Sequence, residues 1–401
     1  MFSEIKEYLD DPIEAFQLRL KNDKNPNKLD LGLGIYRDQA GEVATLSSVR
    51  QAEQRLASRP TDKGYRSPMG NAVYIERMEK LLFQSCLESQ PDMSVQSIQT
   101  PGAGAGCRVG AEFVKRLSPT SRVWASIPNW GHQLEFFENA GLELKYFPYY
   151  DLENSRFQFS EMMSALEEMQ EGDVLLLHGC CNNPTGQDPS LEQWRAIAEL
   201  CSTKGVLPFV DIAYQGYGDG VDEDLLGMQL MASLVREMIV VVSSSKSFTI
   251  YRERAGLLSL ITNDKAGSLN NAYRLLRDVA RGNYFMPPDH GAEIVAEILG
   301  DEALSAEWRQ ELDVIRERIY SLRALLRDTI EAMDPSQDAS YLVQQKGMFS
   351  CLPLSPEEQI EMEQKYGIYM LPNARINFAA LAKDKAERVA KALLAIKNNN
   401  N

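Results

Sequence analysis

The chain has 401 residues, of which 44% are hydrophobic, so it is long enough for a large core and for two domains. Its formal net charge of −15 disfavours binding to nucleic acid or to an anionic membrane, because an acidic protein is not attracted to either surface. No run of about 20 apolar residues could span a bilayer, the N-terminus lacks the apolar core of a signal peptide, and six scattered cysteines without a CxxC pair favour a cytoplasmic protein.

The N-terminal part is predicted to be a loosely attached arm followed by helices. The segment LDLGLGIYRD, residues 29–38, has the pattern of a short strand that Gly32 and Gly34 interrupt. Glycine at these positions lets a ligand or another chain approach the backbone closely, and a simple bend is the alternative. Helical patterns follow at residues 46–60 and 71–89.

A glycine-rich turn opens an amphipathic helix at residues 100–117. Such a turn aims free backbone N–H groups and the helix dipole at an anion, typically phosphate. Gly102 and Gly104 fit a dinucleotide fingerprint, but Cys107 stands at its third glycine, and no strong strand is predicted before the turn. We therefore predict a phosphate site rather than an NAD or ATP site, with a flexible turn at a helix start as the alternative.

The next part of the chain alternates strands with helices. The helix between the second and third strands is marked by Asp188 as its N-cap, Pro189 in its first turn and Gly205 as its terminator. A spacing of about 30 residues per strand is typical of βαβ units, so we predict a doubly wound, mostly parallel sheet with helices on both faces. The predicted strands are residues 123–126, 174–178, 207–211, 239–243 and 257–261.

The C-terminal part is predicted to belong to a second, smaller α/β domain. A helix over residues 301–333 is long enough to bridge two domains. We assign residues 1–43 to an N-terminal arm and the first part of the small domain, 44–314 to the large domain, and 315–401 to the remainder of the small one. The other predicted elements are strands at residues 341–344, 348–352, 368–371 and 375–379 and a helix at 384–397.

Chemically distinctive side chains follow successive predicted strands. Lys246 follows the apolar run at residues 239–242, and burial there would lower its pKa and free a nucleophilic amine. Because ligands lie outside the carboxyl ends of strands in open α/β sheets, we expect these side chains to meet at one edge. The others are Trp130, Asn183, Asp211, Tyr214, Ser243, Ser245 and Arg254.

Each of these residues also has an ordinary structural explanation. Asp211 could cap a helix, Tyr214 and Trp130 could be core aromatics, Asn183 before a proline could belong to a turn, and Lys246 could be an exposed strand-end lysine. Together with a phosphate turn, however, they match the chemistry of pyridoxal phosphate, which needs a lysine for its aldehyde and a carboxylate for its pyridine nitrogen. The three histidines do not have the spacing of metal ligands, so we expect no metal.

The motifs NNPTG (residues 182–186), DIAYQG (211–216) and SSSKSF with ERAG (243–256) resemble those of the aspartate/aromatic aminotransferase family, and the resemblance covers nearly the whole chain. It implies the fold type I architecture, pyridoxal phosphate as cofactor and a homodimer with shared active sites. Lys246 would then be the Schiff-base lysine and catalytic base, with Asp211 at the pyridine nitrogen and Tyr214 at the phenolic oxygen.

The resemblance also implies the remaining binding residues. The α-carboxylate of the substrate would be held by Arg375, because a guanidinium pairs with a carboxylate through two parallel hydrogen bonds. A side-chain carboxylate would be held by Arg281 of the neighbouring subunit. Within the same subunit, the cofactor would contact Ala103, Gly104, Trp130, Asn183, Ser243, Ser245 and Arg254. It would also contact Tyr65 of the neighbouring subunit. The substrate would also contact Gly34, Trp130 and Asn183.

Several residues depart from the family pattern. Gln133 and Asn182 replace histidines near the ring aspartate, and Gly104 replaces a threonine at the phosphate. Three positions near Arg281 that are polar in aspartate-specific relatives hold Val43, Gly64 and Met286 here. The loss of polar partners and the gain of apolar surface favour substrates with aromatic side chains over substrates with acidic ones. The sequence thus predicts transfer of the amino group of tyrosine, phenylalanine or tryptophan, and also of aspartate, to 2-oxoglutarate.

Four alternatives differ in reaction or in class. An aspartate-preferring aminotransferase would keep the mechanism, and β-elimination would keep the cofactor, but two carboxylate-binding arginines suit amino-acid and 2-oxo-acid exchange better. A non-catalytic module that binds pyridoxal phosphate or another ligand is a different class. An NAD-dependent oxidoreductase is disfavoured by Cys107 in the glycine turn.

Overall fold

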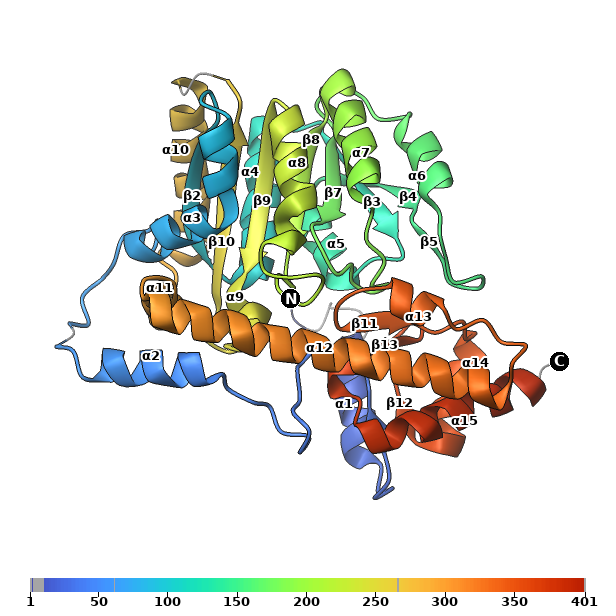
Figure 1. Ribbon diagram of the computed structural model, residues 1–401. Helices are drawn as coiled ribbons and strands as arrows, with labels where there is room; N and C mark the ends of the chain where they lie inside the picture. Colours follow the sequence, from blue (N-terminus) through green and yellow to red (C-terminus); the bar gives the residue numbers. More distant parts are fainter. Residues whose placement is uncertain (1, 3–10, 61, 265–266, 400–401) are drawn as a thin grey trace.

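A central seven-stranded sheet forms the middle layer of the larger part of the protein in this computed structural model, which describes residue 2 and residues 11–60, 62–264 and 267–399 (Figure 1). All strands run parallel except β10, which is antiparallel to both of its neighbours. In spatial order the strands are β2 (Ser94–Pro101), β10 (Ala255–Thr262), β9 (Glu237–Ser243), β8 (Leu207–Ile212), β7 (Val174–His178), β3 (Arg122–Ile127) and β4 (Glu143–Pro148).

The strand direction of β10 follows from the length of its connection. Only residues 244–254 separate β9 from β10, and they contain the single-turn helix α9 (Ser244–Ser247). A parallel crossover needs about a dozen residues or more, so the chain turns back instead. The mostly parallel α/β sheet predicted from the sequence is therefore confirmed.

Helices cover both faces of the sheet, as predicted. Because side chains alternate along a strand, Val240 and Val242 of β9 pack in one core cluster, whereas Ile239 and Val241 pack in the other. The helices around the sheet are α3 (Ala72–Ser89), α4 (Gly102–Leu117), α5 (Gly131–Glu138), α6 (Phe159–Leu166), α7 (Leu191–Lys204), α8 (Leu226–Leu234), α10 (Gly267–Tyr284) and α11 (His290–Leu299), with the 3-10 turn η2 (Glu223–Leu225) before α8.

Two edge strands were not predicted, and the expectation that no strand precedes the glycine turn was wrong. Strand β2 runs directly into α4, but it reads SVQSIQTP and lies at one edge of the sheet with its first residues half-buried. Strand β4 lies at the other edge and carries Glu143 and Lys145. Edge strands can be polar, so they lack the apolar run that marks a buried strand.

Helix α7 begins two residues later than predicted. Its N-cap is Ser190, which forms a capping box with Gln193, whereas the carboxylate of Asp188 accepts hydrogen bonds from the backbone N–H groups of Cys181 and Asn182. Asp188 therefore fixes the loop after β7 instead of capping a helix. The predicted terminator is confirmed, because Gly205 adopts the left-handed conformation at the C-cap.

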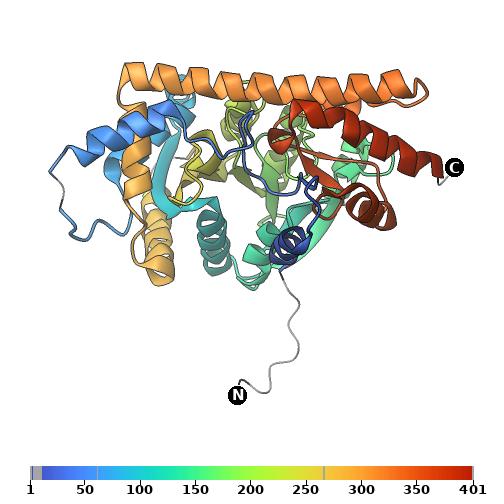
Figure 2. The same cartoon turned by 90° about the horizontal axis from the view of Figure 1, so that it is seen from below.

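The long helix α12 (Glu302–Met333) runs along one side of the whole molecule and joins its two parts (Figure 2). In the smaller part, β1 of the N-terminal segment pairs with β12, so both ends of the chain share one small sheet. The elements here are α1 (Pro12–Asn22), β1 (Leu29–Asp30), α13 (Tyr341–Gln344), β11 (Phe349–Cys351), α14 (Pro356–Tyr366), β12 (Ile368–Tyr369), β13 (Arg375–Asn377), η3 (Phe378–Ala380), η4 (Lys383–Lys385) and α15 (Ala386–Asn399). Helix α2 (Ser47–Ala57) lies apart from them and packs against α11 and α12 (Figure 1), and a separate hairpin contains β5 (Tyr150–Asp151) and β6 (Arg156–Phe157).

The strand predicted at residues 341–344 is the helical turn α13, which is a correction. The short, mostly apolar segment YLVQ does not distinguish a strand from a buried helical turn, because it is too short to show a period. The turn is held from outside by Arg323 of α12, whose buried guanidinium donates to the carbonyl groups of Leu342, Gly347 and Phe349.

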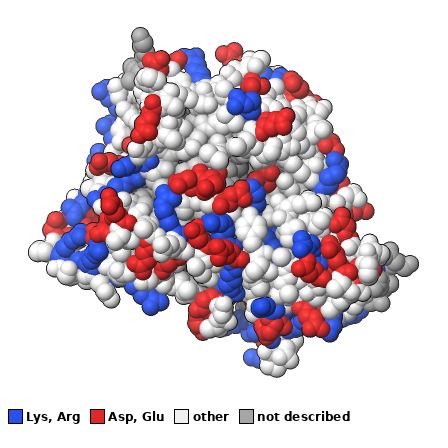
Figure 3. Space-filling view, in the orientation of Figure 1, with Lys and Arg blue, Asp and Glu red and all other residues white. Residues whose placement is uncertain are grey.

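The surface carries charged side chains of both signs (Figure 3). On the face that Figure 3 shows, acidic and basic side chains are interspersed without a continuous basic stripe. Within the described residues, no helix combines the length and the apolar character needed to cross a bilayer.

Candidate active site

A hollow of about 320 Å³ lies at the carboxyl ends of β7, β8 and β9, next to β13. The predicted residues that line it are Gly34, Ala103, Gly104, Trp130, Asn183, Asp211, Tyr214, Ser243, Ser245, Lys246, Arg254 and Arg375. Two predicted residues, Tyr65 and Arg281, are not among its lining residues.

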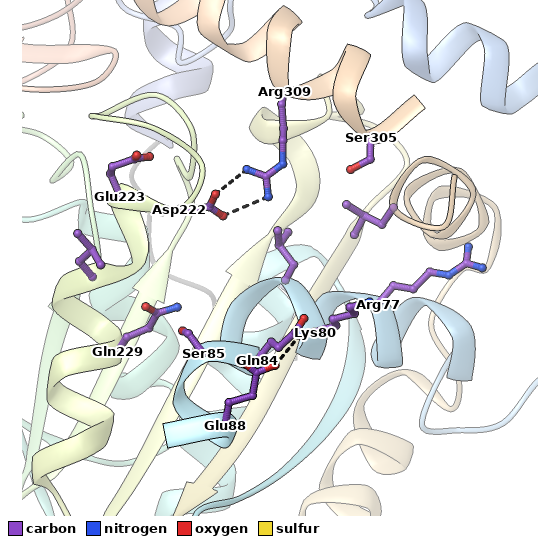
Figure 4. A pocket seen from close by; sticks show the side chains of 13 residues that line it. Arg77, Lys80, Gln84, Ser85, Glu88, Asp222, Glu223, Gln229, Ser305 and Arg309 are labelled. Carbon is purple, nitrogen blue, oxygen red and sulfur yellow. Dashed lines mark hydrogen bonds and ion pairs between the residues drawn. The ribbon is translucent and has the colours of Figure 1, made fainter. Parts of the chain in front are cut away.

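A larger hollow of about 560 Å³ lies between α3, η2, α8 and α12 and contains none of the predicted residues (Figure 4). Two pairs of its lining side chains bind each other: Arg309 pairs with Asp222 at 2.8 Å, and Gln84 donates to Glu88. The chemistry of the lining therefore selects the smaller hollow, although the other one has more space.

Lys246 lies in α9, immediately after β9. The turn is capped by Ser243, whose hydroxyl accepts from the N–H of Ser245, and Nζ of Lys246 lies 4.9 Å from the centre of the Tyr214 ring. Burial lowers the pKa of Lys246 to about 8, and the nearby Asp211 only partly opposes this effect. Part of the population therefore carries a neutral, nucleophilic amine near neutral pH.

Asp211 lies at the end of β8 and presents its two oxygens differently. Oδ2 accepts a 2.6 Å hydrogen bond from Nε2 of Gln133 and lies 3.9 Å from the thiol of Cys107. Oδ1 is buried and has no hydrogen-bond partner among the described residues. Burial raises the pKa of Asp211 to about 6, while Lys246 and Gln133 lower it. Because buried polar atoms are normally hydrogen-bonded, the unpaired Oδ1 fits a ligand that places an N–H donor in the hollow.

The start of α4 and the side chain of Arg254 form an anion-binding corner. A helix begins with backbone N–H groups that have no partner within it, here at Ala103 and Gly104. The guanidinium of Arg254 donates to Oγ of Ser245 at 3.2 Å. Gly102 has a φ of +77°, and a β-carbon there would lie 2.2 Å from Nη2 of Arg254. Glycine at this position lets the arginine lie against the helix start.

Arg375 is a buried cation that has donor groups left free. Nη1 donates to Oδ1 of Asn183 at 2.8 Å and Nη2 donates to the carbonyl of Gly32 at 2.9 Å, while the guanidinium lies 4.1 Å above the ring of Phe349. Nε has no partner among the described residues. Burial lowers the pKa of Arg375, but the group remains a cation at neutral pH. An unpaired buried guanidinium N–H fits a carboxylate ligand.

Aromatic and apolar side chains that the sequence did not single out complete the walls. Phe136 packs edge-on against Trp130 at 6.3 Å, and Phe349 packs edge-on against Tyr214 at 5.5 Å. Ile13 of α1 and His178 at the end of β7 also line the hollow. Ordinary core patterns contain such residues, so no sequence signal marks them as part of a site.

Tyr65 and Arg281 lie together on the surface, outside the hollow. Both pack against Phe285: the Tyr65 ring at 5.9 Å and the Arg281 guanidinium at 5.5 Å. Tyr65 is 88% exposed and Phe285 is 49% exposed. We call these three residues the exposed aromatic cluster. Neither predicted side chain lines the hollow of its own chain.

The residues in the hollow fit pyridoxal phosphate. The free Oδ1 of Asp211 can accept from a protonated ring nitrogen, the corner at α4 can hold a phosphate, and Lys246 supplies the amine. Tyr214 and Asn183, 3.5 Å apart between the hydroxyl and Nδ2, can hold the phenolic oxygen.

One Cys–Cys–Asp group, Cys180, Cys181 and Asp224, has ligand atoms within 4.8 Å of one another. The Asp224 carboxylate there already accepts three backbone N–H groups.

Comparisons with known proteins agree with this fit. The family model "Aminotransferase class I and II" matches residues 26–393. The aspartate aminotransferase of Salmonella typhi is 38% identical over 99% of this chain and 100% of its own length, and the tyrosine aminotransferase of Rhizobium meliloti is 37% identical over 97% and 98%. The aromatic-amino-acid aminotransferase of Burkholderia pseudomallei, solved covalently bound to pyridoxal phosphate, is 34% identical, with a TM-score of 0.94 over 99% of both chains.

Proposed function

Because the chain belongs to the class I and II aminotransferases, which work with pyridoxal phosphate, we propose that it transfers the amino group of tyrosine, phenylalanine or tryptophan to 2-oxoglutarate and also accepts aspartate. Relatives named for aspartate and for tyrosine are equally similar, so sequence identity does not select the substrate. The observation that carries the aromatic proposal is the ring of Phe285 over Arg281, the residue that would bind a second carboxylate.

The exposed aromatic cluster supports this preference in two ways. The ring of Phe285 lies against the guanidinium of Arg281 and also packs against Tyr65, and Val43, another apolar residue, is 46% exposed. Such surface favours an aromatic side chain by a few kcal/mol at most. The guanidinium remains present, and this favours continued use of dicarboxylates such as aspartate and 2-oxoglutarate.

The proposed mechanism gives a task to the reacting and charged residues of the hollow. When bound, the cofactor supplies an electron sink that stabilises the charge left at the substrate Cα. Lys246 Nζ, with its lowered pKa, accepts the proton from that carbon. Arg375 holds the α-carboxylate, and Asp211 Oδ1 accepts from the ring N–H. The phosphate is held by the backbone amides of Ala103 and Gly104, by the hydroxyls of Ser243 and Ser245, and by Arg254.

We further propose a homodimer in which Tyr65 and Arg281 complete the hollow of the neighbouring subunit. The proposal is supported by the exposure of the aromatic cluster and by the fact that Tyr65 and Arg281 do not line the hollow of their own chain. It is tested by mixing Lys246→Ala, which should be inactive, with Arg281→Ala, which should have low activity toward aspartate. Only if Arg281 acts across the interface does a mixed dimer contain one site with both residues, so aspartate activity should return on mixing. Activity that stays low in verified mixed dimers would contradict the proposal.

The substrate proposal is tested by rapid mixing of the cofactor-loaded protein with phenylalanine or aspartate, followed by the absorbance of the bound cofactor. We expect the larger second-order rate constant with phenylalanine. A larger constant with aspartate would favour an aspartate-preferring enzyme with the same mechanism. No response to any amino acid would contradict transamination and favour a binding module.

A further inference from the structure

A line of hydrogen bonds leads away from Asp211 behind the hollow. Nε2 of Gln133 lies 2.6 Å from Asp211 Oδ2, and Oε1 of Gln133 lies 3.0 Å from Nε2 of His178. The other ring nitrogen of His178 lies 3.0 Å from Nδ2 of Asn182. Oδ1 of Asn182 is bonded by the hydroxyl of Thr185 at 2.8 Å. We call Gln133, His178 and Asn182 the amide relay.

The fold brings the members of the amide relay together from three places. Gln133 lies on α5, His178 is the last residue of β7, and Asn182 lies in the loop after it. His178 is the register partner of Asp211 on the neighbouring strand β8. Gln133 and Asn182 are buried, so water does not compete for their amide groups.

The two ends of the amide relay fix its direction independently. At one end, the backbone N–H and the hydroxyl of Thr185 both point to Asn182 Oδ1, and a backbone N–H can only donate. Asn182 must then donate to Nδ1 of His178, whose proton lies on Nε2 and is given to Gln133 Oε1. At the other end, an ionised Asp211 can only accept, and this requires Nε2 of Gln133. Both ends give the same orientation.

The chemistry of the amide relay keeps it from changing with pH. Its two amides do not titrate, and burial lowers the pKa of His178 to about 4, so the imidazole is neutral near pH 7. A protonated imidazole would place N–H groups of Asn182 and His178 against each other. The arrangement thus holds Oδ2 of Asp211 and leaves Oδ1 free.

We propose that Gln133, His178 and Asn182 are positioning residues that turn the free oxygen of Asp211 toward the cofactor ring nitrogen through a one-way chain of hydrogen bonds. The inference rests on the proposed contact of Asp211 with that nitrogen. It explains why a glutamine suffices behind the aspartate, because the position needs a fixed donor and not a group that titrates.

The first test measures the amide relay itself by NMR of the ¹⁵N-histidine-labelled, cofactor-loaded protein. The chain has only three histidines, so variants of His132 and His290 assign the His178 signals. We expect a neutral ring with the proton on Nε2 between pH 5.5 and 8. Asn182→Asp, of nearly the same shape, should place an acceptor at Nδ1 and make His178 protonated in this range. A proton on Nδ1 in the unsubstituted protein would overturn the inference.

The second test measures retention of the cofactor during dialysis of the loaded protein at pH 5.5 and 8.5. In Gln133→Glu, a protonated glutamic acid can still donate to Asp211, but this donor is lost as pH rises through its pKa. We expect affinity near that of the unsubstituted protein at pH 5.5 and an additional loss of about tenfold at pH 8.5. Gln344→Glu, at an exposed position, is the control for charge.

The outcomes separate the inference from the function. An equal effect of Gln133→Glu at both pH values would reduce Gln133 to a packing role and overturn the inference. If Gln133→Glu does not fold, Gln133→Met should lower affinity equally at both pH values, and unchanged affinity would overturn the inference. Failure of the unsubstituted protein to retain pyridoxal phosphate would instead contradict the proposed function.

Discussion

Replacing Gly102 with alanine should weaken cofactor binding in addition to destabilising the fold. At a φ of +77° a β-carbon costs about 1–2 kcal/mol of stability. The new atom would also lie 2.2 Å from Nη2 of Arg254, and the guanidinium can move aside because it ends a flexible side chain. Its displacement removes a charge-assisted hydrogen bond to phosphate, worth about 1.5–3 kcal/mol. We therefore expect the Kd for pyridoxal phosphate to rise about ten- to a hundredfold.

The matched control is Gly172→Ala. Gly172 has a φ of +84°, but no atom lies within 4 Å of its added β-carbon, so this variant carries the backbone cost alone. Thermal unfolding of the cofactor-free proteins should show similar losses for the two variants. Equilibrium dialysis with pyridoxal phosphate should show a higher Kd only for Gly102→Ala. Equal Kd values for both variants would refute the assignment of the corner at α4 as the phosphate site.

Other expectations concern catalysis, stability and pH. Lys246→Ala should abolish turnover, and normal turnover in a steady-state assay would contradict its role as the base. Arg281→Ala should reduce kcat/KM for aspartate more than for phenylalanine, and equal losses would remove it from the side-chain site. Arg323→Met should cost about 3–5 kcal/mol in chemical denaturation, because buried carbonyls lose their donor, whereas Arg327→Met one turn away should cost under 1 kcal/mol. Burial lowers the pKa of His178 to about 4 in the folded protein, whereas the unfolded value is about 6.5. Below pH 6.5 the unfolded chain therefore binds more protons than the folded protein does. Stability should therefore fall as pH falls from 6.5 to 4, and His178→Gln should reduce this slope in acid denaturation.

The sequence predicts best what is encoded by neighbouring residues. The apolar run in β9 followed by serines and Lys246 indicates a buried strand and the residue after it, and strands of the same kind carry Asp211 and His178 near their carboxyl ends. The edge strand β2 was missed because its polar residues are tolerated only next to solvent. Local pattern thus gives the centre of the sheet and leaves its edges open.

Contacts between distant residues could not be predicted. Nothing in the segment around Gln133 tells that His178 lies behind it, because their contact depends on how α5 packs at the end of β7. The clustering of Phe285 with Tyr65 and Arg281 depends in the same way on a surface turn and a loop far apart in the chain. Local motifs indicate the groups that we propose to react, but the groups that orient them depend on tertiary packing.

The pairing of β1 with β12 has a consequence for biosynthesis. Leu29 leaves the ribosome early, but its partner Ile368 is made near the end of translation. The guanidinium of Arg375, which also follows late, is held by the carbonyl of Gly32. The sheet that contains β9 is complete much earlier, and N-terminal units generally fold first during synthesis. We expect nascent chains stalled before residue 368 to resist protease over the central sheet while residues 11–30 remain open to cleavage, so Arg375, the proposed carboxylate-binding residue, is fixed in place last.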